Sequence, residues 1–140
     1  MDKAYIRFDI AMINDLKTRY ESVIEFILSD LPQVNWNSSK EIVKYLNETL
    51  DIDVKDAKIK TVAGLLQCYD ENSYEFNVIS GLTYYLKLKY TLKNYIGCIL
   101  RHETNGIVAL RLEDGEWKMP NKQPLPIAPE INECIIARYS

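Results

Sequence analysis

A change of hydrophobic period at Asn105-Gly106 constrains the fold of this chain more than any other feature. Before it, apolar residues recur every three or four positions, which is typical of amphipathic helices. After it the period is two over residues 107–112, and Asp114-Gly115 supplies a hairpin turn. The pattern predicts an α+β fold that is mostly helical over residues 1–104 and ends in a small antiparallel β region over residues 105–140, within one compact domain.

Four helices are expected before the change of period. Asp9 is a suitable N-cap for a first, long helix. Ser38 and Glu41 form a capping box, in which the serine hydroxyl accepts the Glu41 amide and the Glu41 carboxylate reaches back to the cap. Thr61 opens a short third helix. The fourth helix is the longest and most aromatic, and we expect it to run over about residues 77–100.

The last part of the chain is expected to be extended. Trp117 lies on the returning strand of the predicted hairpin. Ile131 to Ala137 is expected to form a last strand. The segment between them is predicted to be irregular because prolines exclude a helix or a central strand. These prolines are Pro120, Pro124, Pro126 and Pro129.

Composition limits the class of protein. The chain has 140 residues, a net charge of −3 and 47% hydrophobic residues, enough for a core without disulfide or metal support. It has no apolar run of about 18 residues and no signal-peptide pattern, so we expect a cytoplasmic protein without membrane contact. Cys68, Cys98 and Cys134 contain no CxxC pair. They are expected to be reduced and mostly buried.

Catalytic patterns are scarce in the sequence. Nucleophilic catalysis needs a base beside a serine or cysteine, and the only histidine is His102, at the end of the fourth helix. The five glycines are scattered and form no phosphate-binding loop. Carboxylate pairs such as Asp51/Asp53 are expected in solvated loops. We therefore expect no enzyme activity, no cofactor and no metal site.

The fourth helix has an uneven charge distribution. No acidic residue occurs between Glu75 and Glu103, although four basic residues do. Lys89 and Lys93 lie four positions apart, on one side of a helix, where like charges repel unless an anion offsets them. A DNA phosphate is one such anion. Two interpretations remain: a DNA contact, or lysines that extend over an apolar surface into solvent.

Residues 35–42 read Asn-Trp-Asn-Ser-Ser-Lys-Glu-Ile and resemble the Asn-x-Asn-Ser-Pro-Lys-Gln-Leu stretch in the thumb of family A DNA polymerases, the DNA polymerase I type. Three later segments are similar to other parts of that family, in the same order. Residues 85–96 are similar to its long thumb helix, residues 105–108 to its Asp-Gly-Arg-Ile strand and residues 120–126 to its Pro-Asn-Leu-Gln-Asn-Ile-Pro loop. The resemblance implies a thumb-like helical bundle followed by the start of a palm.

The chain also departs from that family. The arginine and lysine of the family's thumb helix fall on Leu86 and Tyr90, and the arginine of its Thr-Gly-Arg signature falls on Glu116. The resemblance ends in a first palm strand over residues 131–138, before the aspartate motif, and the fingers helix and second palm aspartate have no counterpart. Two-metal phosphoryl transfer needs those carboxylates. The resemblance therefore implies a non-catalytic protein.

Eleven residues are candidates for DNA contact. The resemblance implies that the start of the second helix holds phosphate or sugar oxygens, which suits the positive end of a helix. It also implies that amides of the proline-rich loop face the minor groove, while the lysines of the fourth helix add positive charge. The candidates are Asn35, Asn37, Ser38, Ser39, Lys40, Lys87, Lys89, Lys93, Asn94, Asn121 and Gln123.

The expected function is that of an accessory subunit of a family A type DNA polymerase, a split thumb that assists primer-template binding in replication or repair. Its partners would be a polymerase-like chain that supplies palm and fingers, and DNA as primer-template or single strand. Two alternatives remain open. One is a stand-alone DNA-binding module, and the other is a helical scaffold or inhibitor that binds a replication protein.

Overall fold

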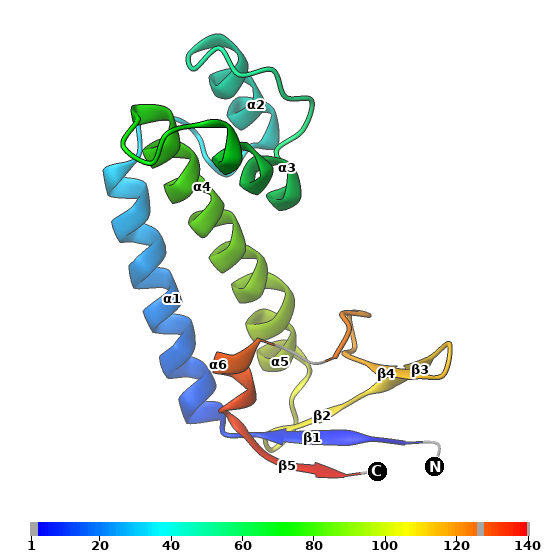
Figure 1. Ribbon diagram of the computed structural model, residues 1–140. Coiled ribbons are helices and arrows are strands. Elements are labelled where there is room, and N and C mark those ends of the chain that lie inside the picture. The colour runs from blue at the N-terminus through cyan, green and yellow to red at the C-terminus, as the bar shows by residue number, and fades with distance from the viewer. Residues whose placement is uncertain (1–2, 126–127, 140) are drawn as a thin grey trace. The chain divides into compact units, whose positions relative to one another are not determined.

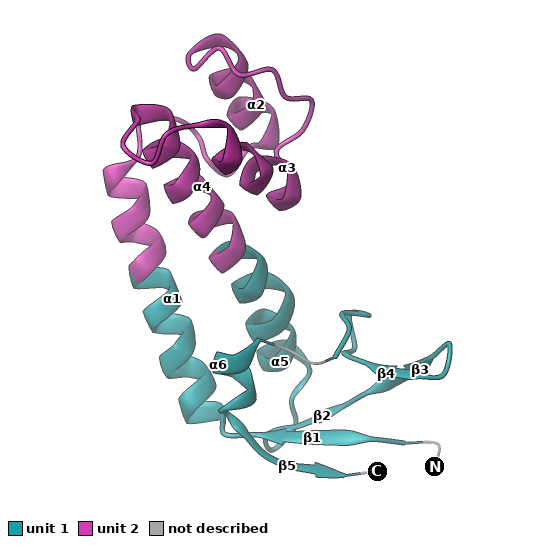
Figure 2. Ribbon diagram, in the orientation of Figure 1, with its two compact units in different colours: residues 1–22, 89–140 teal, residues 23–88 magenta. Residues whose placement is uncertain are grey.

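The computed structural model describes residues 3–125 and 128–139. It has the predicted α+β fold, with most helices before the hairpin. Contacts divide the chain into two compact units, shown in Figure 2. Unit 1 consists of Met1–Ser22 and Lys89–Ser140, and unit 2 consists of Val23–Leu88. Each unit has its own hydrophobic core.

Figure 1 shows the helices and strands along the chain. The helices are α1 (Ile10–Asp30), α2 (Ser39–Glu48), α3 (Ile59–Gly64), α4 (Tyr74–Thr91), α5 (Gly97–His102) and α6 (Pro129–Asn132). A 3-10 turn, Leu65–Cys68, follows α3, and a π-helical turn, Leu92–Ile96, joins α4 to α5. The strands are β1 (Tyr5–Phe8), β2 (Ile107–Ala109), β3 (Arg111–Glu113), β4 (Glu116–Lys118) and β5 (Ile135–Tyr139).

The sheet of unit 1 contains a strand that was not predicted. Its order is β2-β1-β5, and both pairs are antiparallel. Ile6 lies opposite Val108 on one side and Arg138 on the other. Ile6 and Phe8 alternate with more accessible residues and are 1% and 2% exposed. The first strand therefore lies at the centre of the sheet, and the β region is not confined to the end of the chain.

The predicted hairpin is confirmed as β3 and β4, with Leu112 opposite Trp117. Asp114 and Gly115 have φ values of 52° and 79°. These positive values are those of the tight turn that matches strand twist. The predicted continuous strand over residues 107–112 is instead divided, because β2 pairs with β1 while β3 pairs with β4.

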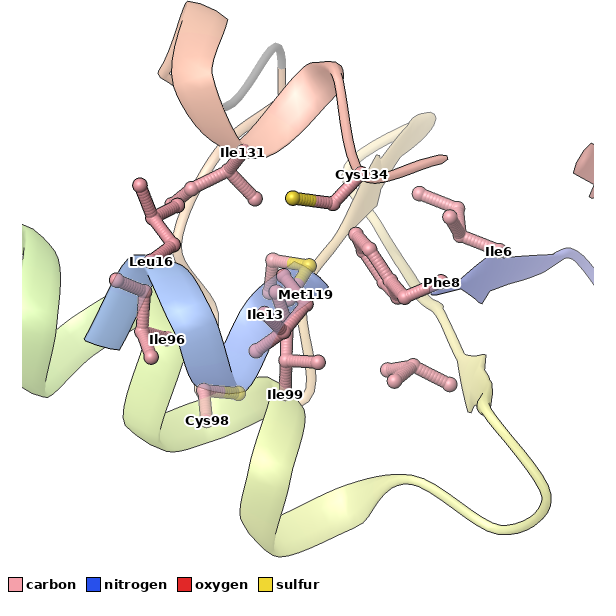
Figure 3. Packing of buried hydrophobic residues seen from close by; sticks show 11 residues of the cluster. Ile6, Phe8, Ile13, Leu16, Ile96, Cys98, Ile99, Met119, Ile131 and Cys134 are labelled. Carbon is pink, nitrogen blue, oxygen red and sulfur yellow. The ribbon is translucent and has the colours of Figure 1, made fainter. Parts of the chain in front are cut away.

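The core of unit 1 joins both ends of the chain. In Figure 3, side chains from α1, β1, α5 and the segment that contains α6 point toward one another. Cys98 and Cys134 are buried within this core, as expected, whereas Cys68 is exposed. The buried members are Ile6, Phe8, Ile13, Leu16, Ile96, Cys98, Ile99, Val108, Met119, Ile131 and Cys134.

The core of unit 2 forms around α2 and α4. Leu46 of α2 and Leu82 of α4 are completely buried. Trp36 packs edge-on against Tyr45, with ring centroids 5.4 Å apart, and its Nε1 donates to the Pro32 carbonyl oxygen at 2.9 Å. The turn that precedes α2 is thereby held against the core.

Three predicted boundaries shift in the structure. The expected last strand begins only at Ile135, because residues 129–132 form α6. Pro129 starts this helix at a position where a missing amide hydrogen is tolerated, so the expectation that proline excludes a helix here was wrong. The third helix begins at Ile59 rather than Thr61. The fourth begins earlier, at Tyr74, where the Ser73 hydroxyl accepts the Phe76 amide at 3.1 Å.

Among the residues that the structure describes, no helix combines the length and the apolar character needed to cross a membrane.

Two glycines with positive φ allow a matched test of the fold. A Cβ on Gly106 (φ 83°) would lie 2.9 Å from the Phe8 carbonyl oxygen, whereas a Cβ on Gly115 (φ 79°) meets nothing within 4 Å. We expect Gly115→Ala to lower the free energy of unfolding by about 1 kcal/mol from backbone strain alone. Gly106→Ala should lower it by clearly more, as measured by urea denaturation. Equal losses would contradict the close approach of β1 to Gly106.

Candidate nucleic-acid interface

The start of α2 presents part of the predicted DNA-binding segment. The Ser38 Oγ accepts the Glu41 amide at 3.3 Å, which confirms the predicted serine cap. The Ser38 amide donates to the Asn35 carbonyl oxygen at 3.1 Å. The capping box predicted from the sequence had the Glu41 carboxylate as the acceptor of this amide. The Asn35 Oδ1 accepts the Asn37 amide at 3.2 Å. The turn is thus closed by its own polar groups and begins the helix.

Asn37 has a role inside unit 2. Its Oδ1 accepts the Tyr85 hydroxyl at 2.9 Å, and Tyr85 is 2% exposed. Burial raises the pKa of Tyr85, so its hydroxyl stays protonated and can donate. Asn37 therefore links the turn to α4. Ser39 and Lys40, in the first turn of α2, are exposed.

An open depression of about 500 Å³ lies beside the first turn of α2. It combines that turn with the segment that leads into α3, and three of its side chains are lysines. We name it the lysine pocket. Its lining residues are Ser39, Lys40, Val43, Lys55, Asp56, Ala57 and Lys58.

The sequence reasoning missed Lys55 and Lys58. Both lie in the stretch that was assigned to a loop, and no periodicity connects them to Lys40. The signal that was present is the pair of lysines three residues apart just before a helix. Only the folded chain shows that this pair shares a depression with Ser39 and Lys40.

Asp56 is the single acidic residue of the lysine pocket. Hydrogen bonds from the Thr61 side chain and from the Lys58 amide hold the pKa of its carboxyl below the usual value. The Lys58 amide lies 3.0 Å from Oδ1. Asp56 therefore stays ionised at neutral pH and supports the start of α3. The lining keeps an excess of positive charge, with three lysines against one carboxylate.

A second group of candidates meets in unit 1, where residues 119–124 contact the π-helical turn. The Asn121 Nδ2 donates to the Asn94 carbonyl oxygen at 2.7 Å. The Tyr90 hydroxyl donates to the Gln123 Oε1 at 2.6 Å, and the Tyr95 hydroxyl donates to the Pro124 carbonyl oxygen at 3.2 Å. We name this arrangement the tyrosine clasp.

The tyrosine clasp brings together Asn94, which the sequence placed on the fourth helix, and Asn121 and Gln123, which it placed in the proline-rich loop. All three form hydrogen bonds within the clasp. The Asn121 side chain donates to the backbone carbonyl oxygen of Asn94 in the π-helical turn, and the Gln123 side chain orients Tyr90. Lys93 is exposed beside them, and Lys89 is partly exposed. Their contact with DNA stays a prediction.

Lys122 is a further residue that the sequence reasoning did not select. It is exposed at the tip of residues 119–124, which we call the clasp loop. Its φ of 70° is a conformation that costs energy for any residue except glycine. Its amide donates to the Met119 carbonyl oxygen at 2.8 Å, and the Met119 amide donates to the Gln123 carbonyl oxygen at 3.0 Å. These bonds fix the turn that carries the lysine.

The candidates fall into two groups by unit. Asn35, Asn37, Ser38, Ser39, Lys40 and Lys87 belong to unit 2, and Lys89, Lys93, Asn94, Asn121 and Gln123 belong to unit 1. Lys87 is exposed on α4 and does not line the lysine pocket.

Within residues 3–125 and 128–139, no three His, Cys, Asp or Glu side chains gather closely enough to hold a metal ion. His102 is exposed at the end of α5. Burial raises the pKa of the Cys98 thiol, which disfavours the reactive thiolate.

Comparison with known proteins yields no match: no family model, curated protein or solved structure matches the chain.

The tyrosine clasp can be tested through Asn121. In Asn121→Ala the Asn94 carbonyl oxygen loses its donor, so we expect the free energy of unfolding to fall by about 1 kcal/mol. Asn121→Asp should cost at least as much, because it places a second acceptor against that oxygen. Lys93→Ala, at an exposed position of the same turn, is the control and should change stability by less than about 0.5 kcal/mol. Urea denaturation measures all three, and a stable Asn121→Asp variant would contradict the hydrogen bond.

Proposed function

We propose that this protein is a non-catalytic, DNA-contacting accessory subunit of a family A type DNA polymerase and assists primer-template binding in the cytoplasm. The observation that carries the proposal is the lysine pocket at the start of α2. This is also the segment whose sequence resembles the polymerase thumb. Chemistry and resemblance thus support the same surface.

The lysine pocket suits a phosphodiester. Three lysines line one depression, the first turn of α2 adds backbone amide donors at the positive end of the helix, and Ser39 adds a hydroxyl. A phosphate that binds there releases counterions from the DNA. Because none of these groups reads a base edge, the grip would be independent of sequence. That property is required of a subunit that follows a moving primer terminus.

An edge strand in the sheet of unit 1 supports the proposal that a partner chain binds there. In the order β2-β1-β5, strand β5 lies at an edge and pairs only with β1 among the described residues. Ile136 and Tyr139 on this strand are 59% and 46% exposed. An exposed, partly apolar edge can accept a strand from another protein. We propose that the polymerase-like chain binds there.

One observation favours the scaffold alternative. A groove of about 520 Å³ in unit 2 is lined by residues of α1 and α4, including Phe26 and Tyr74. Phe26 is 73% exposed and Tyr74 is 58% exposed. Exposed aromatic rings of this size are common anchors in protein interfaces. The scaffold alternative requires protein binding without any dependence on the lysine pocket.

DNA binding tests the lysine pocket directly. We expect the double variant Lys55→Gln/Lys58→Gln to bind a primer-template more weakly. The slope of log affinity against log salt should become shallower by about 0.9 for each phosphate that the variant no longer binds. Asp56→Asn should bind more tightly, because it removes the opposing charge and keeps an Oδ1 that can accept the Lys58 amide. Fluorescence anisotropy over a salt series measures both.

Lys60→Gln is the matched control, since Lys60 is exposed on α3 but does not line the lysine pocket. It loses one charge from the same region and should retain most of the affinity. An equal loss of affinity per removed charge in Lys60→Gln and in the double variant would show that only net charge matters. Unchanged binding in the double variant would exclude the lysine pocket as the DNA-binding surface.

Purification of the tagged chain from its native host tests the partner. We expect a polymerase-like chain that carries the missing metal-binding aspartates, together with primer-extension activity in the eluate. Lys55→Gln/Lys58→Gln should retain the partner but reduce extension. If the purified protein binds DNA but no polymerase-like chain is recovered with it, the stand-alone module would be favoured.

A further inference from the structure

We infer that Tyr90 is a stacking platform for an unpaired base of single-stranded DNA, with the lysines around the tyrosine clasp holding the adjacent phosphates. This inference rests on the proposed function, because it adds the unpaired template or primer strand to the DNA that the protein contacts. It concerns unit 1 alone and involves none of the residues of the lysine pocket.

The ring of Tyr90 is held in place yet accessible. Its hydroxyl donates to the Gln123 Oε1 at 2.6 Å, and its ring meets the Tyr95 ring edge-on, with centroids 6.4 Å apart and an interplanar angle of 62°. Tyr95 is itself fixed by the Pro124 carbonyl oxygen. Even so, 43% of Tyr90 remains exposed. A ring that is already fixed loses little conformational entropy when a ligand stacks on it.

The two segments that form the clasp are rich in lysine. The two segments that meet in the clasp, residues 89–96 and 117–125, contain four lysines and no acidic residue. Lys93 and Lys122 are exposed. The neighbouring carboxylate of Glu113 is paired with Arg111 at 3.3 Å, and Arg111 also donates to the Pro120 carbonyl oxygen of the loop at 3.4 Å.

Lys122 strengthens this inference. It holds a left-handed backbone conformation that glycine would adopt without strain, in a turn that two backbone hydrogen bonds fix. The turn is two residues from Pro124, which binds Tyr95, and next to Gln123, which binds Tyr90. The strained backbone therefore carries a lysine next in sequence to Gln123, whose side chain orients the ring.

The combination of an exposed aromatic ring and nearby lysines favours single-stranded DNA over a duplex as the ligand. Stacking on Tyr90 needs a base with a free face, and the faces of bases inside a duplex are covered by their neighbours. Proteins that bind single strands combine a basic surface with aromatic rings for the same reason. Lysines are depleted from protein-protein interfaces, whereas here they surround one exposed ring, that of Tyr90.

The test compares ring and hydroxyl at position 90 in the full chain. The probe is a fluorescently labelled deoxythymidine oligonucleotide of about a dozen nucleotides, alone and as a duplex with its complement. We expect Tyr90→Leu to bind the single strand about tenfold more weakly and the duplex within about twofold of the parent chain. Tyr90→Phe keeps the ring and should stay within about threefold for both probes.

Several outcomes would overturn the inference. These are unchanged single-strand binding by Tyr90→Leu, an equal loss for both probes, or absence of single-strand binding by the parent chain. Tighter binding of the corresponding RNA than of DNA would also overturn it. The double variant Lys55→Gln/Lys58→Gln separates this result from the proposed function, because it should lose duplex affinity while the effect of Tyr90→Leu on the single strand persists.

Crosslinking gives a readout that does not depend on how the variants fold. A 5-iodouracil base that stacks on an aromatic ring forms a covalent bond to it on irradiation. We expect the modified peptide from the unaltered chain to carry the oligonucleotide on Tyr90. A crosslink on Trp117 or other residues, with Tyr90 unmodified, would overturn the inference.

Discussion

Unit 1 depends on the ladder of hydrogen bonds around β1. This strand has four residues, yet it pairs with β2 on one side and β5 on the other, and its Ile6 and Phe8 fill the core. The amide of Phe8 also donates to Gly106, where the helical part of the chain gives way to the strands. Segments from both ends of the sequence must therefore meet before the sheet and its core exist, which places the pairing among slow, non-local folding events.

Local chemistry explains which parts of the fold the sequence revealed. Asp9 and Ser38 form the caps that their side chains predict, and Asp114-Gly115 forms the hairpin, because each depends on atoms within a few residues. The strand β1 was missed because four alternating residues carry little signal without their partners. The π-helical turn was missed for a related reason, since its residues fit the helical pattern and only the surrounding contacts select the wider turn.

The candidate site also has features that local sequence predicts and features that only the folded chain shows. The sequence placed Ser39 and Lys40 at the start of a helix, and the structure places them there. It could not join them to Lys55 and Lys58, since that depends on how the loop after α2 returns toward the helix. It selected Asn94, Asn121 and Gln123 for contact with DNA, whereas the folded chain uses the Asn94 carbonyl oxygen and the side-chain amides of Asn121 and Gln123 to hold the tyrosine clasp.

The π-helical turn also determines how this chain tolerates changes of length. Such a turn contains one residue more than an α-helix needs for the same advance, and the Gly97 amide accordingly bonds back to the Leu92 carbonyl oxygen, five residues earlier. Deleting one residue of the turn Leu92–Ile96 would restore a regular α-helix. The deletion would also rotate Lys89 and Tyr90 by about 100° relative to α5. The clasp loop would then meet a different side of the helix. A homologue that lacks this extra residue would keep the helix and its core but present another surface.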